Sequence, residues 1–265
     1  MNVRYRVGAS SDPTATKPTN KAGQPAAEPV EPRPGTKGNV GQQSTNRAQS
    51  RNRVTQALDR VRQAGRQRKK ERFTALLHHV NVDTLKTAFY ALKRKAAPGV
   101  DGVTWQDYES DLELRLEDLH GRVHRGAYRP QPSRRTYIPK ADGKQRPLAI
   151  AALEDKIVQG ATVLVLNAIY EVDFVGFSYG FRPRRGPHDA LDALSAAIKI
   201  KKVNWILDAD IQNFFGAVSQ EWLIRFLEHR IGDKRIVRLI QKWLKAGILE
   251  DGVVTVDDRG RVKGR

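Results

Sequence analysis

Two aspartates interrupt an apolar run in the stretch 205–215, which reads WILDADIQNFF. If this run is a β-strand, Asp208 and Asp210 point to the same face, because residues two apart do so in a strand. An isolated buried charge is costly, so something must compensate the two carboxylates. Mg²⁺ prefers oxygen ligands and binds through one or two carboxylates together with substrate phosphates. These residues therefore indicate either a magnesium site or aspartates paired with some of the chain's many arginines.

A magnesium site at Asp210 would serve phosphoryl transfer, because a pair of metal ions activates the attacking hydroxyl and stabilises the leaving oxygen. The chain leaves the expected strand near Asn213, which places Asp210 at the strand's end. One aspartate cannot hold two metal ions. At least one more carboxylate must come from elsewhere, typically from a neighbouring strand.

The charge of the chain indicates a polyanionic partner. Lys and Arg outnumber Asp and Glu by 47 to 29, which gives a formal net charge of +18 over 265 residues. This excess opposes folding through self-repulsion, so we expect nucleic acid as the partner, with an anionic membrane surface as the second candidate. The densest basic block is 60-RVRQAGRQRKKER-72. A solvated helix face has the same pattern, but phosphate contact is an equal alternative for Arg66, Arg68, Lys69 and Lys70.

Composition also excludes several classes of protein. No apolar run approaches the roughly 20 residues of a membrane-spanning helix, and the N-terminus lacks the apolar core of a secretory signal. Without cysteine there are no disulfides and no thiolate metal sites. Residues 1–50 are rich in Pro, Thr, Ser, Gly and Gln and cannot bury enough apolar surface to fold, so we expect a disordered tail. Together these features predict a cytoplasmic protein.

The elements that position the candidate residues are mostly helices. Apolar residues spaced by three and four predict helices over the basic block, over 153–170 and from Pro187 onward. Four more helices begin after residues able to cap them, namely Asp83, Thr104, Ser219 and Asp233. Between them, 133–150 reads as a β-hairpin with an Asp-Gly turn and a cationic tip, and 248–265 as a strand pair.

Five blocks follow one another along the chain: 96-AAPGVDGVT-104, 136-TYIPKADGKQRPLAI-150, 154-EDKIVQ-159, 178-SYGFRPRRGPHDAL-191 and 207-LDADIQNFF-215. Each alone occurs by chance, but their order and spacing resemble the bacterial group II intron reverse transcriptases, also called maturases. The resemblance covers about Val54 to Gly252. It implies an α+β fold with right-hand polymerase-like fingers and a partial palm, helix-rich, with a β-hairpin and short palm strands.

The resemblance also implies a division of the chain. After the disordered tail, 1–50, comes a helical RNA-binding extension at 51–126. The fingers occupy 127–202, and the partial palm occupies 203–265.

Roles for individual residues follow from the same resemblance. Asp210 matches the first catalytic aspartate of the palm, where it ligates Mg²⁺ with the help of the Ile211 carbonyl; Asp208 is not at the ligand position. Phe215 matches the residue that packs under the nucleotide sugar and rejects a 2′-hydroxyl. At the hairpin, Lys140 and Arg146 match the cations that hold the incoming triphosphate, as suits charged donors facing phosphates.

The Tyr-Gly-Phe-Arg-Pro loop supplies two further candidates. Arg182 and Arg184 would contact the backbone of the template or primer. The alternative is that this loop forms a packed structural corner.

The implied activity is that of an RNA-directed DNA polymerase: nucleotidyl transfer from a dNTP to the 3′-OH of a DNA primer or target on an RNA template, by two-metal chemistry. The family's second carboxylate pair, in a Tyr-x-Asp-Asp hairpin, does not occur in these 265 residues. Asp257–Asp258 is no substitute, because Thr255 and Val256 precede it. We therefore expect a truncated or split reading frame that cannot extend a primer alone, its C-terminal half being made separately in the split case.

Two alternatives remain open. The first is a non-catalytic, maturase-like fragment that binds intron RNA through the basic helix and fingers and assists splicing. The second is another palm polymerase, such as a retron-type or diversity-generating reverse transcriptase. The Pro-Gly-Val-Asp-Gly block and the Tyr-Gly-Phe-Arg-Pro loop favour the group II type over the second alternative.

Overall fold

The structure is a computed structural model that describes residues 40–139, 143–201, 203, 205–211 and 214–256, without the side chains of 40–47 and 215–216. Its elements in chain order are α1 (Val40–Gln67), the 3₁₀ turn η1 (Leu77–His79), α2 (Val82–Ala91), α3 (Trp105–Glu109), α4 (Leu112–His124), β1 (Ser133–Pro139), β2 (Gln145–Ile150), α5 (Leu153–Asp173), α6 (Pro187–Lys201), α7 (Phe214–Ala217), α8 (Gln220–Arg230), α9 (Lys234–Leu244), β3 (Ile248–Glu250) and β4 (Val253–Thr255). This helix-rich α+β composition agrees with the fold class expected from the sequence.

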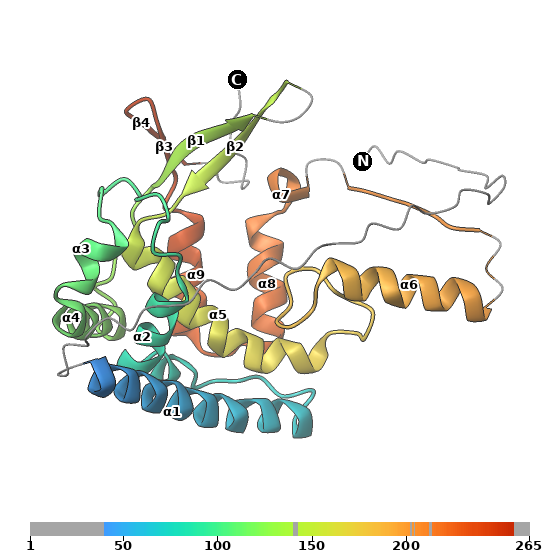
Figure 1. The fold of residues 1–265 in the computed structure, drawn as a ribbon, viewed down its shortest axis with the longest axis horizontal. Helices are drawn as coiled ribbons and strands as arrows, with labels where there is room; N and C mark the ends of the chain where they lie inside the picture. The colour runs from blue at the N-terminus through green and yellow to red at the C-terminus, as the bar shows by residue number, and fades with distance from the viewer. Residues whose placement is uncertain (1–39, 140–142, 202, 204, 212–213, 257–265) are drawn as a thin grey trace, which may run out of the picture.

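The core is built around α5, which packs against both α1 and α2 (Figure 1). Its inward positions Ile157, Ala161 and Ala168 are fully buried, as the helical spacing predicted. Small residues allow the close approach of α5 and α2: a Cβ added at Gly160 would lie 3.2 Å from the Cβ of Ala88. A larger side chain at either position would push the two helices apart.

Three of the four predicted helix caps are confirmed. Thr104 begins α3 with a complete capping box, and Ser219 and Asp233 accept hydrogen bonds from the first turns of α8 and α9. The fourth prediction was wrong: α2 is capped by Asn81 rather than Asp83, because the side-chain Oδ1 of Asn81 accepts from the backbone N–H of Thr84 at 3.0 Å. The helix predicted after Thr104 is also divided, ending as α3 and resuming as α4.

The turn that joins α8 to α9, residues 230–233, holds the segment 68–77 that follows α1. Arg230 is buried, and its guanidinium donates to the carbonyl oxygens of Arg68 at 3.0 Å and Glu71 at 2.6 Å. The same guanidinium pairs with Asp173 at the end of α5, at 2.8 Å. One arginine therefore connects α1, α5 and α8, and we call residues 230–233 the clamp.

The other end of the clamp binds the same segment through backbone groups. Gly232 N–H donates to the carbonyl oxygen of Phe73 at 2.8 Å. One oxygen of the buried Asp233 carboxylate accepts from the N–H groups of Leu76 and Leu77, at 2.8 and 3.0 Å. Its other oxygen caps α9 by accepting from Arg235 N–H. The clamp thus fixes the start of α9 against Leu76 and Leu77, where η1 begins.

The strands form one sheet in the order β2-β1-β3-β4. β1 and β2 are the predicted antiparallel hairpin, in the register Arg135 opposite Ala149 and Ile138 opposite Arg146. The predicted C-terminal strand pair is present as β3 and β4, and β3 adds to β1 in parallel, which the sequence did not indicate. The buried Arg135 lies 3.6 Å from Glu250, so an ion pair joins hairpin and C-terminal strand.

Two sequence-based expectations are corrected. α1 begins at Val40, inside the segment expected to be a tail, and residues 1–39 lie outside the described part of the chain. The expected palm strand at 205–211 is no strand in the structure: it is an exposed segment, with Trp205 at 82 % and Leu207 at 72 % of full exposure. A strand needs a partner ladder to satisfy its backbone, and in this segment only Asp208 and Ile211 form isolated β-bridges.

No helix in the described ranges has both the length and the apolar character needed to cross a membrane.

The clamp yields a prediction about stability. Burial alone would raise the pKa of Asp233, but hydrogen bonds from Leu76, Leu77 and Arg235 outweigh it and lower the pKa to about 2. A carboxylate with a depressed folded-state pKa stabilises the fold above its unfolded pKa of about 3.9, and that stability is lost as pH falls toward 2. We expect Asp233→Ala to cost about 2–4 kcal/mol at pH 7 in urea unfolding, and less at pH 3.

Asp111→Ala is the matched control, because Asp111 precedes α4 without making a side-chain capping bond. Its loss should cost under about 1 kcal/mol at both pH values. Equal destabilisation by the two substitutions would contradict the role assigned to the clamp.

Candidate functional site

Asp208 and Asp210 lie within the exposed residues 205–211, between α6 and α7 (Figure 1). Both residues are exposed, as is Ile211, at 52 % of full exposure. Within the described ranges no arginine or lysine forms an ion pair with Asp210. The carboxylates are therefore open to solvent, which removes the desolvation cost that an unpaired buried charge would carry.

The donor set around Asp210 is incomplete for a pair of magnesium ions. The described part of the chain contains no group of three or more His, Cys, Asp or Glu side chains able to hold a metal ion. Asp210 and the Ile211 carbonyl offer the oxygen chemistry that Mg²⁺ prefers. Two ions would need further carboxylates, and the described residues form no group of three such side chains.

The nucleotide-binding candidates are only partly described. Lys140 lies outside the described residues, and so does the side chain of Phe215, although its backbone belongs to α7. Arg146 is exposed on β2, opposite Ile138 of β1. Figure 1 places the outer end of the hairpin and α7 on the same upper side of the molecule.

Arg182 does not have the role predicted for it. Its side chain is 5 % exposed and pairs with Glu171 of α5 at 3.1 Å. It also donates to the carbonyl oxygens of Val175 and Ser178, at 2.9 and 2.8 Å. These partners hold the guanidinium of Arg182 inside the fold, which favours the structural alternative for this residue, whereas Phe177 and Phe181 of the same loop are exposed. Arg184 is exposed and has a left-handed backbone, with φ of 59°.

The basic block extends past the end of α1. Arg66 is in the last turn of the helix, and Arg68, Lys69 and Lys70 follow it, all exposed. Arg68 has only a long, exposed ion pair with Glu71 at 3.6 Å, which contributes little. The clamp holds the backbone here, so the positive charges lie on a fixed loop. Sequence reasoning missed Arg230, which sets this position, because its partners are far away in the chain.

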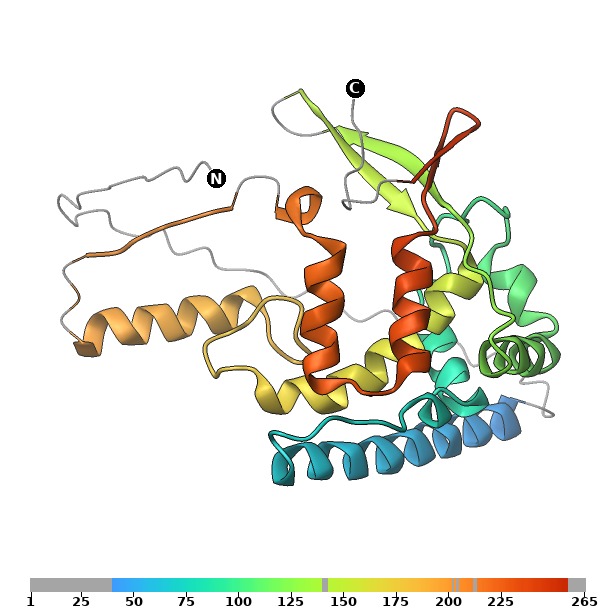
Figure 2. The same cartoon turned by 180° about the vertical axis from the view of Figure 1, so that it is seen from behind.

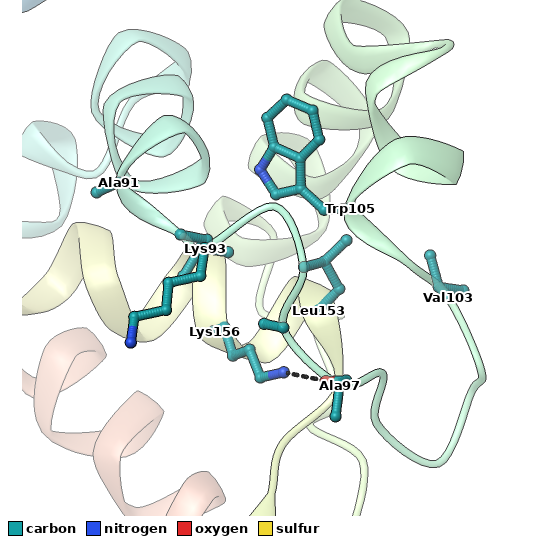
Figure 3. A pocket seen from close by; sticks show the side chains of 9 residues that line it. Ala91, Lys93, Ala97, Val103, Trp105, Leu153 and Lys156 are labelled. Atoms are coloured by element: carbon teal, nitrogen blue, oxygen red, sulfur yellow. Dashed lines mark hydrogen bonds between the residues drawn. The ribbon is translucent and has the colours of Figure 1, made fainter. Parts of the chain in front are cut away.

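The Pro-Gly-Val-Asp-Gly turn packs on the start of α5. A Cβ added at Gly99 would lie 2.5 Å from the Cα of Ala152, so only glycine allows this approach. Lys156 donates to the carbonyl oxygen of Ala97 at 3.0 Å, the bond drawn in Figure 3. A cavity of about 290 Å³ remains beside the turn, with Trp105 in its wall. The turn is thus fixed to the core of the fold. The cations that precede it, Lys93, Arg94 and Lys95, are exposed.

Comparison with known proteins decides what these parts belong to. Residues 138–264 match the family model described as "Reverse transcriptase (RNA-dependent DNA polymerase)". The chain therefore contains part of a reverse transcriptase domain. The match begins in β1 and includes the hairpin, α5, the Asp210 segment, α8 and α9.

Curated relatives of this reverse transcriptase sequence include intron-encoded proteins. Protein YkfC of Escherichia coli is 36 % identical over 170 residues, 63 % of this chain and 45 % of that protein. The group II intron-encoded protein LtrA of Lactococcus lactis is 31 % identical over 196 residues, 73 % of this chain and 32 % of that protein. An uncharacterized 91 kDa protein in the cob intron of Schizosaccharomyces pombe is 39 % identical over 133 residues, 50 % of this chain and 16 % of that protein. The chain thus spans under half the length of each.

The two loop arginines yield a prediction. Arg182→Gln should lower the melting temperature, because it leaves Glu171 without its partner in a buried corner. Arg184→Gln should leave the melting temperature within about 1 °C, because the side chain is exposed. Differential scanning calorimetry of both variants distinguishes these outcomes. A larger shift for Arg184→Gln than for Arg182→Gln would refute the assignment of the corner.

Proposed function

We propose that this chain supplies the fingers and the first part of the palm of a group II intron-type RNA-directed DNA polymerase. The carrying observation is the reverse transcriptase match over 138–264, which includes Asp210 on a solvent-open segment. The relatives encoded in introns support the intron type. The regions are those expected from the sequence: an RNA-binding extension at 51–126, fingers at 127–202 and a partial palm from 203, although α1 extends the first region back to Val40.

The proposed reaction is transfer of a nucleotide from a dNTP to a primer 3′-OH on an RNA template. The 3′-oxygen forms the new bond to the α-phosphorus, and pyrophosphate leaves. Arg146 and Lys140 bind the triphosphate as charge-assisted donors, and Phe215 packs under the sugar. Mg²⁺, held in part by Asp210 and the Ile211 carbonyl, would supply charge stabilisation for attacking and leaving oxygens.

The carboxylates that complete this site come, in this proposal, from polypeptide outside these 265 residues. The exposed segment 205–211 supports this, because its apolar side chains are uncovered and its backbone has no described partner strand. Adding a strand to it would bury Trp205 or Leu207 and place new side chains beside Asp210. By itself the chain binds nucleic acid but does not polymerise.

A second candidate function is binding of intron RNA to assist splicing, without catalysis. The observation that favours it is the exposure of Arg66, Arg68, Lys69 and Lys70 in the basic block, whereas the donors for a metal at Asp210 are incomplete among the described residues. The two functions differ in what they require of Asp210. Polymerisation needs its carboxylate, whereas RNA binding does not.

Primer extension tests the catalytic proposal. The purified 265-residue chain, given Mg²⁺, four dNTPs and an RNA template with an annealed DNA primer, should produce no extended product. Addition of a polypeptide that carries the remaining palm strands should produce extension that Asp210→Ala abolishes, a loss of at least about 10³-fold. Extension by the chain alone that depends on Asp210 would show that the site is complete without a partner.

RNA binding tests the role of the basic block. Arg66→Gln/Arg68→Gln should weaken binding to a single-stranded RNA oligonucleotide and reduce the slope of log K against log salt by about 1.4, for two lost phosphate contacts. The matched control is Arg115→Gln/Arg225→Gln, which removes the same charge from arginines that already pair with Asp111 and Glu221.

Fluorescence anisotropy over a range of salt concentrations measures both pairs of variants. If Arg115→Gln/Arg225→Gln weakens RNA binding as much as Arg66→Gln/Arg68→Gln does, the basic block attracts RNA only through overall charge and is not a specific binding site. If Asp210→Ala leaves RNA affinity and splicing assistance intact and the basic-block variant loses both, the non-catalytic function is the correct one.

A further inference from the structure

A second group of cations lies apart from the basic block, where the end of α4 faces α9. Figure 2 shows α9 standing between α8 and α4. A cavity of about 140 Å³ opens between α4 and α9, and its polar lining is almost entirely basic: His124, Arg125, Arg235, Arg238 and Lys242. No carboxylate lines it. Its volume is several times the ~30 Å³ that one water molecule occupies in the liquid.

The local sequence explains why positive charge accumulates here. α9 is strongly amphipathic, with Ile236, Val237 and Leu239 buried and cations on the outside. No acidic residue occurs between Asp233 and Glu250. Beyond Asp233 at its first turn, the outer face of α9 therefore has no local carboxylate to neutralise it, and the remaining charge must be balanced from other elements or by a ligand.

One of the cavity cations, Lys242, and its neighbour Arg129 outside the lining are balanced by backbone carbonyl oxygens. Lys242 donates to the carbonyl oxygens of Gly126 and Tyr128, at 2.9 and 2.7 Å. Arg129 donates to the same Gly126 oxygen at 3.2 Å. The pKa of Lys242 is lowered by burial and by its neighbours Arg129 and Arg238, so the surroundings of this ammonium remain positive despite the two carbonyls.

A third cation is balanced by the clamp. Arg235 lies 3.3 Å from the carboxylate of Asp233. His124 contacts the Val80 carbonyl oxygen through Nε2 at 2.9 Å. Within the described residues this leaves Arg125 and Arg238 as the cavity cations whose side chains have no ion pair and no hydrogen bond. Two unpaired guanidinium groups at the mouth of one cavity, surrounded by further positive charge, favour an anion there.

We propose that this α4–α9 cavity binds a backbone phosphate of nucleic acid, with Arg125 and Arg238 as its principal donors. A polymer fits better than a free ion, because the positive charge continues beyond the cavity. A second cavity, of about 320 Å³, is lined by Arg60, Arg68 and Arg72. The buried, adjacent residues Leu76 and Leu77 each line one of the two cavities, and Glu71 is the one carboxylate in the lining of the second.

The proposal rests on the proposed nucleic-acid-binding function and adds a contact surface that is separate from the basic block. The test variant is Arg125→Gln/Arg238→Gln, and the control is again Arg115→Gln/Arg225→Gln. The probe is a labelled single-stranded RNA oligonucleotide, with anisotropy measured at several salt concentrations. We expect the test variant to bind roughly tenfold more weakly at low salt and to lose about 1.4 from the salt slope. The control should change affinity by less than twofold.

Three outcomes separate the hypotheses. If the test variant binds RNA like wild type while Arg66→Gln/Arg68→Gln loses affinity, the cavity proposal fails and the proposed function stands. If neither variant changes RNA binding, both fail. If inorganic phosphate shifts the arginine side-chain NMR signals of wild type but not of the test variant, and RNA affinity is unchanged, the cavity is a small-anion site and the proposal is overturned.

A thermal melt shows whether the test variant is still folded. Arg125 and Arg238 are exposed, so the test variant should melt within about 2 °C of wild type. If it melts lower, the charge-retaining variant Arg125→Lys/Arg238→Lys is measured as well. RNA affinity restored by lysine supports the phosphate contact. If the lysine variant folds normally but binds RNA as weakly as the glutamine variant, the phosphate contact is contradicted.

Discussion

The arrangement of this fold depends on the clamp, in which four consecutive residues join parts of the chain that lie over 150 positions apart. Arg230 binds carbonyl oxygens of the segment after α1, and Asp233 binds N–H groups of the same segment. A buried cation and a buried anion are each satisfied by backbone groups and by one charged partner, as buried charges must be. Because the clamp fixes both the basic block and the start of α9, it determines the spacing of the two cationic surfaces.

The helices differ in how much apolar surface they bury, and the exposed apolar surface indicates where another molecule could bind. Helices α1, α2 and α5 bury a continuous core. By contrast α6 has no buried residue, and its Leu191 and Leu194 are exposed. Trp222 and Phe226 of α8 are exposed as well. Large apolar side chains left exposed on a surface mark a site of association when they lie together, and here they occur on α6 and α8, the helices that precede and follow residues 205–211 in the chain.

The sequence predicted those features that depend on neighbouring residues. The hairpin at 133–150 was predictable because an Asp-Gly turn specifies it locally, and Thr104, Ser219 and Asp233 were recognisable as caps from their position before apolar periodicity. α1 was underestimated, because its first turns have few apolar residues and composition alone suggested disorder.

Features that depend on distant partners were not predictable. Arg182 looked like a phosphate ligand, since the sequence shows a cation in a loop but not that Glu171 will face it. The parallel pairing of β3 with β1 joins residues more than 100 positions apart and has no local pattern. The expected strand at 205–211 failed for the same reason, because apolar alternation fits a pleated surface but does not supply the neighbouring strand. The α4–α9 cavity was missed because its arginines come from two separate elements.

The cationic surface and the exposed apolar residues at 205–211 call for partners of different kinds. A net charge of +18 is relieved by a polyanion, whose binding releases counterions and weakens as salt rises. Trp205 and Leu207 are exposed and gain nothing from a polyanion backbone. An apolar protein surface would cover them, and such an association strengthens in salts excluded from protein surfaces. In the proposed function, nucleic acid binds the cationic faces and polypeptide covers residues 205–211, so the two partners do not compete for the same contacts.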